Sequence, residues 1–381
     1  MSMNKKNYSL LELLLITLLF EPTLFVKYSK INWLFIIGAC ISFAYIFLKV
    51  FRNEKFSIFT IEIIILRVLY IFTTVINKGD ILKVGYQSII IVSLCLYAEF
   101  FYRKERIGDF IEILTTICRW YLLINIVTYI CFPDGLYSEE KYIYFLGYRT
   151  RFTEFIFLMI PLSIFQYSQM KNKKYLFIDI VIIYLTISLP KISTAIIGCI
   201  VLILTYLIII KIKKFNFKIL LYVAILLNML IIVFRVQNAF AFFIEDILGK
   251  STDLTYRTVI WDYSYKYIFD KECLLGHGYP DNGNFIFWAD RMWQAHNQIL
   301  QLLYEIGIFG TILFFNICYK VQKNSNFIYL KDKRILIFVL SLFSFYIMMI
   351  TEIYGYYLPF YALLYVIYFF DFSLLNNNER K

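Results

Sequence analysis

Long runs of apolar residues constrain this chain more than any other feature. Residues 61–76 read IEIIILRVLYIFTTVI and residues 194–214 read TAIIGCIVLILTYLIIIKIKK. A helix of about 20 apolar residues crosses the hydrocarbon core of a bilayer. Within lipid every backbone polar group must be paired internally, so such runs fold as helices and not as open sheets. The sequence therefore predicts an all-α integral membrane protein.

The apolar stretches are separated by polar turns and predict about twelve transmembrane spans. They lie near 9–26, 31–50, 57–76, 81–101, 110–131, 154–169, 175–190, 193–210, 217–235, 305–320, 335–352 and 355–372. The net charge is +11, but the lysines and arginines fall in short clusters between spans. With a cytoplasmic N-terminus nearly all of these clusters lie on the cytoplasmic side, as the positive-inside rule requires. We therefore expect a multi-pass protein with both termini cytoplasmic and a lipid bilayer, not nucleic acid, as its partner.

This layout divides the chain into three parts. Residues 1–236 hold spans 1–9 with a short outside loop near 132–152, residues 237–304 form a large outside loop, and residues 305–381 hold spans 10–12 and a cytoplasmic tail. The large loop carries both histidines of the chain, His277 and His296. Within it, residues 255–269 predict an amphipathic helix along the membrane surface, with Val259, Tyr263 and Ile268 on its apolar face.

The end of this loop runs into the next span as AHNQILQLLYEIGIFG, residues 295–310. On a helix, Asn297, Gln301 and Glu305 form one polar stripe, with His296 beside its start. We interpret His296 as a functional imidazole at the membrane boundary. The alternative is that it only caps the helix. Upstream, the glycines of LLGHGYPDNGN predict a tight loop able to approach a ligand closely.

Arginines flank both outside loops. Arg149 and Arg151 lie where the short loop re-enters the membrane, and Arg257 and Arg291 lie in the large loop. The guanidinium group suits bidentate recognition of phosphate, so arginines that converge from the two loops suit a pyrophosphate. The alternative is that they are interfacial anchors.

Three charged residues fall inside predicted spans: Glu62, Arg67 and Arg119. Such charges mark either a functional cavity or a buried ion pair. Glu62 and Arg67 do not share a helix face, so each needs a partner from another helix.

The cysteines predict neither a metal centre nor a disulfide framework. Five of the seven lie in predicted spans, which leaves Cys131 and Cys273 as the one pair able to meet outside. The chain contains no Cys-x-x-Cys or Cys/His ligand spacing. We expect no metal and no cofactor.

Four short elements in this region together resemble the signature of the O-antigen ligase and polymerase superfamily. They are an arginine-x-x-x-tryptophan element, a Gly-x-Gly turn, a His-Asn pair and a Glu-x-Gly helix: Arg257 with Trp261, Gly276 with Gly278, His296 with Asn297, and Glu305 with Gly307. The resemblance implies a GT-C-like fold in the bacterial inner (cytoplasmic) membrane. It also implies a glycosyltransferase whose donor is a glycan on undecaprenyl pyrophosphate.

By this resemblance His296 is the catalytic histidine near the acceptor hydroxyl. Arg149, Arg151 and Arg257 then hold the pyrophosphate. The candidate glycan contacts are Trp261, Asn297, Gln301, Glu305 and His277, with His277 also a candidate for shaping the loop. If His296 only positions the sugar, Asp262 and Glu154 are the alternative bases.

Three functions are compatible with these features. The first is a Wzy-type polymerase that joins lipid-linked repeat units of O-antigen, capsule or exopolysaccharide, with a flippase and a chain-length regulator as candidate partners. The second is an O-antigen ligase, which moves the finished glycan to lipid A core or another acceptor. Many ligases carry a Ser-Arg pair where this chain has Lys191 and Ser193, which favours the polymerase. The third is a flippase of the lipid-linked sugar, although transporters usually place their unusual residues near the midplane.

Overall fold

The computed structural model describes residues 8–26, 29–51, 56–136, 142–212, 214–242, 251, 254, 257–270, 272–280 and 294–370. Within these ranges the secondary structure is helical, and the one β-type pairing is an isolated bridge between Tyr144 and Gly147. The predicted all-α class is therefore confirmed for this part of the chain.

The helices follow the apolar runs of the sequence. They are α1 (Leu10–Thr17), α2 (Thr23–Val26), α3 (Ser29–Phe51), α4 (Ile58–Ile76), α5 (Ile81–Arg103), α6 (Ile107–Cys131), α7 (Arg149–Met170), α8 (Lys173–Ser188), α9 (Ser193–Ile209), α10 (Lys218–Ile232), the short 3-10 helix η1 (Val236–Phe240), α11 (Arg257–Ile268), α12 (Gln298–Lys331), α13 (Ile335–Met348) and α14 (Leu358–Tyr368).

Five helices of the described residues are long and apolar enough to cross a membrane. They lie within α3, α4, α5, α6 and α12. Helices α9, α10, α13 and α14 are apolar but shorter. These helices support a multi-pass membrane protein, while the layout of twelve spans stays a prediction.

The structure differs clearly from the predicted spans in three places. The stretch 9–26 is split into α1 and α2, with Pro22 in the connection between them. The span placed at 305–320 is part of a longer helix that begins at Gln298 and continues to Lys331. Residues 349–357, which the sequence assigns mostly to two spans, connect α13 to α14.

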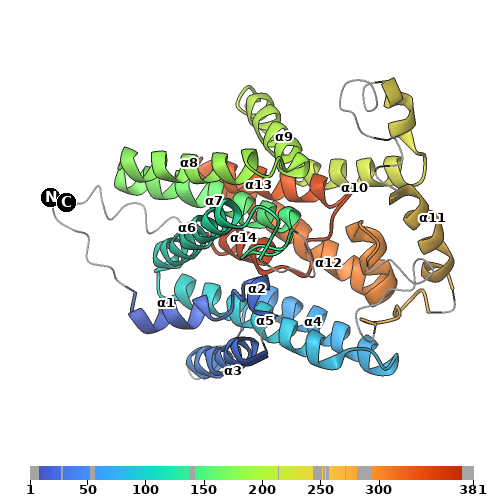
Figure 1. Cartoon of the computed structure of the whole chain (residues 1–381), viewed down its shortest axis with the longest axis horizontal. Coiled ribbons are helices and arrows are strands. Elements are labelled where there is room, and N and C mark those ends of the chain that lie inside the picture. Colours follow the sequence, from blue (N-terminus) through green and yellow to red (C-terminus); the bar gives the residue numbers. More distant parts are fainter. Residues whose placement is uncertain are drawn as a thin grey trace.

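Helix α14 forms the centre of the bundle. It packs against α5, α7, α12 and α13 (Figure 1). All residues from Leu358 to Ile367 are buried, which is the pattern of a helix that is apolar on every side. Helix α11 packs against α12 on the side of the molecule where α12 begins (Figure 1).

The intramembrane charges meet partners from other helices, as expected. Glu62 of α4 pairs with Lys320 of α12. The Arg67 Nε donates a hydrogen bond to Ser88 of α5 at 3.2 Å, and Arg119 of α6 pairs with Asp179 of α8 at 2.7 Å.

All seven cysteines, including Cys131 and Cys273, are free thiols.

Candidate functional site

His296 lies immediately before α12, in a strained backbone conformation. Its φ is +48°, in the left-handed region that side-chain-bearing residues seldom adopt. The following residue, Asn297, caps the helix by accepting a hydrogen bond from the Leu300 amide at 3.0 Å. Asn297 is thus the cap and His296 is left with another role, since strain of this kind persists only where the surrounding structure holds it.

The electrostatic surroundings keep the His296 ring neutral. Burial, and then the nearby positive charge of Arg257, lower the pKa of His296 to about 4. Near neutral pH the ring therefore has a lone pair available to accept a proton. This is the protonation state that a general base requires.

The predicted polar stripe of α12 points into the protein. Asn297 donates to the carbonyl oxygen of Ile350 at 2.9 Å and to Asn228 of α10 at 3.2 Å. This side chain therefore ties the start of α12 to two other parts of the bundle.

Further along the stripe, Gln301 supports the backbone beside His296. Its Oε1 accepts a hydrogen bond from the Ala295 amide at 2.8 Å. Its Nε2 donates to Glu305 at 3.1 Å and to the Tyr356 hydroxyl at 2.9 Å. Glu305 has 0% exposure and also accepts a hydrogen bond from Tyr356. Gln301 and Glu305 therefore contact protein groups that hold His296 in position.

The Gly-x-Gly turn is inserted into a break in α12. Gly307 is non-helical, with φ of 60° and ψ of −166°. The break leaves the carbonyl groups of Tyr304 and Glu305 without their usual helical donors. The amides of His277 and Gly278 donate to these two carbonyl groups at 2.6 and 2.9 Å.

Backbone hydrogen bonds also run in the opposite direction, from α12 to the turn. In a continuous helix the amides of Ile308 and Phe309 would donate to residues 304 and 305. Instead they donate to the carbonyl oxygens of Cys273 and Leu274, at 3.0 and 3.3 Å. The Gly-x-Gly and Glu-x-Gly elements, separate in sequence, are thus two halves of one backbone arrangement.

Helix α11 is connected to the residue that precedes His296. The Trp261 side chain is fully buried, and its Nε1 donates to the Ala295 carbonyl oxygen at 3.1 Å. The predicted helix is confirmed. Its face against the protein is Ile260, Trp261, Ser264 and Ile268, while Tyr263 is 52% exposed.

Two of the three predicted arginines converge. The Arg257 Nη2 donates to Glu352 at 2.7 Å. The Arg151 Nε lies 3.3 Å from Glu154, and its guanidinium lies over the Tyr357 ring.

Tyr354 connects the two arginine pairs. It lies within electrostatic range of Arg151, Glu154, Arg257 and Glu352. The two arginines therefore approach the same region from α7 and α11.

Arg149 is oriented differently. Its Nη1 donates to the Pro190 carbonyl oxygen at 3.3 Å, and its guanidinium faces Tyr142. The structure thus brings Arg151 and Arg257 together and leaves Arg149 toward the connection between α8 and α9.

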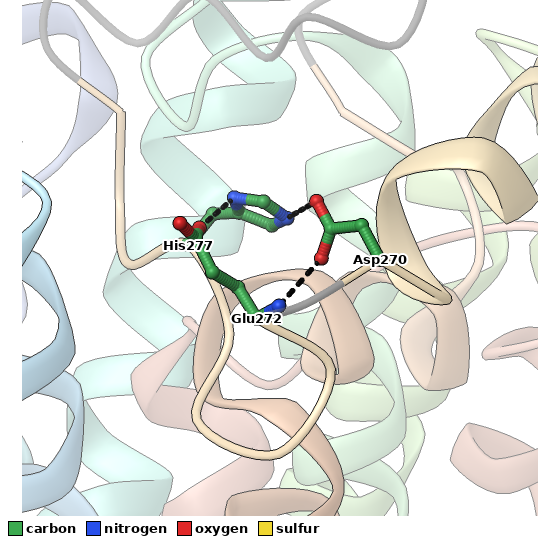
Figure 2. Close-up of side chains that lie close together, drawn as sticks. All are labelled: Asp270, Glu272 and His277. Atoms are coloured by element: carbon green, nitrogen blue, oxygen red, sulfur yellow. Dashed lines mark hydrogen bonds and ion pairs between the residues drawn. The ribbon is translucent and has the colours of Figure 1, made fainter.

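His277 braces the turn beside the site. Figure 2 shows Glu272 and Asp270 on opposite edges of its ring, at 2.6 Å from Nδ1 and 3.2 Å from Nε2. The Nε2 also lies 2.8 Å from the Tyr267 carbonyl oxygen, and the ring stacks on Tyr304.

The same three side chains, Asp270, Glu272 and His277, are close enough together to hold a metal ion. Each ring nitrogen also has an oxygen neighbour from the protein, Glu272 at Nδ1 and both Asp270 and the Tyr267 carbonyl group at Nε2. In the absence of an ion these contacts brace the turn.

The segment 349–357 is the part of the site that sequence reasoning missed. Its residues Tyr354 and Gly355 donate amide hydrogen bonds to Gln298 Oε1 at 2.9 and 2.7 Å. At Gly355 an added Cβ would lie 2.6 Å from Gln298 Nε2. The signal available in the sequence was a glutamate and a glycine, Glu352 and Gly355, within an apolar run.

The remaining candidates take varied places. Asp262 is an exposed residue that pairs with Arg235, while Glu154 is 1% exposed. Lys191 has a φ of +52° between α8 and α9. Arg291 and Gly283 lie outside the described residues.

Comparison with known families gives one match. Residues 175–315 match the model of a family described as O-Antigen ligase. The match confirms the resemblance to the O-antigen polymerase and ligase superfamily. It includes Arg257, His277 and His296 and excludes Arg151 and the segment 349–357. No curated protein and no solved structure matches the chain.

Proposed function

We propose that this protein is a polysaccharide polymerase that extends lipid-linked glycans at the outer face of the bacterial cytoplasmic membrane. The family match supports polymerase or ligase activity in general and gives no support to a flippase. The observations that carry the proposal are a partly buried, neutral His296 within electrostatic range of Arg257, and the convergence of Arg257 with Arg151 near Tyr354.

In the proposed reaction the acceptor oxygen forms a bond with the anomeric carbon of the donor glycan. The bond between that carbon and the pyrophosphate oxygen breaks, and the electron pair leaves with the lipid pyrophosphate. The acceptor proton passes to His296, which acts as general base. Arg257 and Arg151 stabilise the negative charge that grows on the leaving pyrophosphate.

The supporting network has a definite part in this proposal. Trp261 and Gln301 hold the backbone of Ala295, the residue before His296, and Glu305 holds the Gln301 amide. In this scheme they are positioning residues, because their hydrogen-bonding atoms contact other groups of the protein. Asn297 and His277 belong to the same supporting shell.

A ligase is the second candidate. The description of the matching family favours it. The chemistry at His296 and the arginines is the same for both activities, and only the acceptor differs. A ligase would accept lipid A core or another molecule in place of the next lipid-linked repeat unit.

The test is the length distribution of surface glycan in a strain that lacks this gene. Complementation with the wild-type chain is compared with His296→Ala at equal membrane levels. A ladder with the wild type and a single-repeat band with His296→Ala support the polymerase. Lipid-linked ladders that persist in the deletion strain without reaching their acceptor indicate the ligase.

The matched control is Asp262→Asn, which changes the alternative base in the same loop. We expect Asp262→Asn to keep the wild-type ladder, because this carboxylate is exposed and paired with Arg235. Loss of the ladder in Asp262→Asn with retention in His296→Ala would overturn the assignment of His296.

A further inference from the structure

Each arginine that approaches the site is already engaged by a buried carboxylate. Arg257 donates to Glu352 at 2.7 Å, and Arg151 lies 3.3 Å from Glu154. The carboxylates come from different elements, the connection between α13 and α14 and helix α7. Two different elements of the chain therefore each provide a glutamate that contacts an arginine of the same site.

The two members of each pair differ in exposure. The side chains of Arg257 and Arg151 are 22% and 28% exposed, whereas those of Glu352 and Glu154 are 10% and 1% exposed. The guanidinium groups are thus more accessible to an incoming anion than the carboxylates are.

Hydrogen bonding in both pairs is incomplete. Among the described residues, neither carboxylate oxygen of Glu154 has a hydrogen-bond partner, and the buried Nε of Arg257 has none. A buried ion pair is favourable only with good geometry and with its remaining polar atoms satisfied. Among the described residues the Nε donor of Arg257 thus lacks an acceptor, which an incoming anion would supply.

We infer that Glu352 and Glu154 occupy Arg257 and Arg151 in the empty site and yield these guanidinium groups to the pyrophosphate of the donor. This inference rests on the proposed function, because it takes the pyrophosphate to be the incoming anion. In the empty site each carboxylate compensates a cation that is mostly removed from water. In the loaded site the same carboxylates repel the pyrophosphate.

The carboxylates then have a consequence for turnover. The lipid pyrophosphate that leaves after transfer would bind two uncompensated arginines tightly. Because Glu352 and Glu154 compete for these arginines, they weaken the hold on the leaving group and assist its release. They act as positioning residues for the arginines and not as catalytic residues.

The experiment titrates inorganic pyrophosphate into the purified full chain by calorimetry. Glu352→Gln keeps an oxygen that accepts from Arg257 and removes the competing charge. We expect its dissociation constant to fall by about 3- to 10-fold relative to the wild type, while Arg257→Gln raises it. Unchanged or weaker binding by Glu352→Gln overturns the inference.

The control is Glu62→Gln, which neutralises another glutamate paired with a cation, Lys320 of α12. Lys320 follows Glu305 by fifteen residues and lies beyond the break of α12 at Gly307. We expect the affinity of the Glu62→Gln variant for pyrophosphate to match that of the wild type. Tighter binding by Glu62→Gln as well would assign the effect to overall charge and overturn the specific role of Glu352.

Failure of the inference can be separated from failure of the proposed function. If Arg257→Gln leaves pyrophosphate binding unchanged, the pyrophosphate site itself is wrong. If Arg257→Gln weakens binding and Glu352→Gln does not strengthen it, only the inference fails. Should Glu352→Gln prove unfolded in a thermal melt, Glu154→Gln makes the same test at Arg151.

Steady-state kinetics distinguishes competition by Glu352 from a purely structural role of this residue, because the two predict different changes in KM and kcat. Competition predicts that Glu352→Gln lowers KM for the donor and lowers kcat together, because the product leaves more slowly. A lower kcat with a raised KM would contradict competition and indicate a misplaced Arg257.

Discussion

The indole of Trp261 donates a hydrogen bond to the carbonyl oxygen of Ala295, the residue directly before His296. This bond fixes the position of α11 relative to the start of α12. It also satisfies a carbonyl group in a fully buried place, since Ala295 has 0% exposure. The tryptophan of the arginine-x-x-x-tryptophan element therefore acts on the histidine through backbone geometry.

Trp261→Phe is expected to fill most of the same volume without the donor. The unsatisfied carbonyl group of Ala295 then destabilises the loop by about 1–3 kcal/mol. We expect the chain to reach the membrane and glycan transfer to drop markedly. Repeat-length gels at equal membrane levels measure this effect. Wild-type ladders with Trp261→Phe would show that the hydrogen bond has no role in placing His296.

Gly276→Ala and Gly307→Ala are expected to prevent the turn from entering the helix break. Both glycines have positive φ. An added Cβ would lie 2.5 Å from the Gly307 amide nitrogen in the first case and 2.3 Å from the Leu274 carbonyl oxygen in the second. The neighbouring atoms are backbone and cannot move aside easily, so both variants should lose activity and accumulate poorly.

Gly85→Ala is the matched control for these two variants. Among the described residues, no atom other than those of the neighbouring residues and the backbone of its own helix lies within 4 Å of the added Cβ. Gly85 lies within a regular helix, α5, where alanine is preferred over glycine. Membrane levels by immunoblot and ladder length should both match the wild type. Equal tolerance of all three substitutions would contradict the close backbone contact.

Some of this site follows from local sequence rules and some does not. The stripe of Asn297, Gln301 and Glu305 was predictable because helical periodicity alone sets it. The pairing of Gly276 with Gly307 was not, because it depends on a backbone exchange between segments about thirty residues apart in the chain.

The bundle itself was predictable for a different reason. Apolar runs long enough for a membrane fold as helices in nearly any context. The connection 349–357 was hidden by the same rule, since its apolar residues resemble those of the neighbouring spans. Likewise, sequence spacing could not show that Arg151 turns toward Glu154 while Arg149 turns toward Pro190.

The dependence of activity on pH tests the state of His296. Its pKa is lowered to about 4, so the ring is neutral above that pH and loses its ability to accept a proton below it. The acid limb of kcat/KM, which reports the free enzyme, should thus fall near pH 4 and not near the ordinary histidine value of about 6.5. Arg257→Gln removes one cause of the lowered pKa and should move this limb upward. A wild-type limb near 6.5 would contradict a base whose pKa is lowered by its surroundings.

Gln301→Glu is expected to disrupt the polar stripe, and a second substitution is expected to restore it in part. The new carboxylate would face Glu305 at a site where the amide donates at 3.1 Å, so two buried carboxylates would repel each other. Loss of such a buried polar arrangement typically destabilises by about 3–5 kcal/mol. Adding Glu305→Gln to Gln301→Glu returns one amide and one carboxylate to the pair. We therefore expect the double variant to recover membrane level and ladder length relative to Gln301→Glu alone. If the double variant is as inactive as the single one, charge repulsion is not the cause, and the orientation of the Gln301 amide toward Ala295 carries the effect instead.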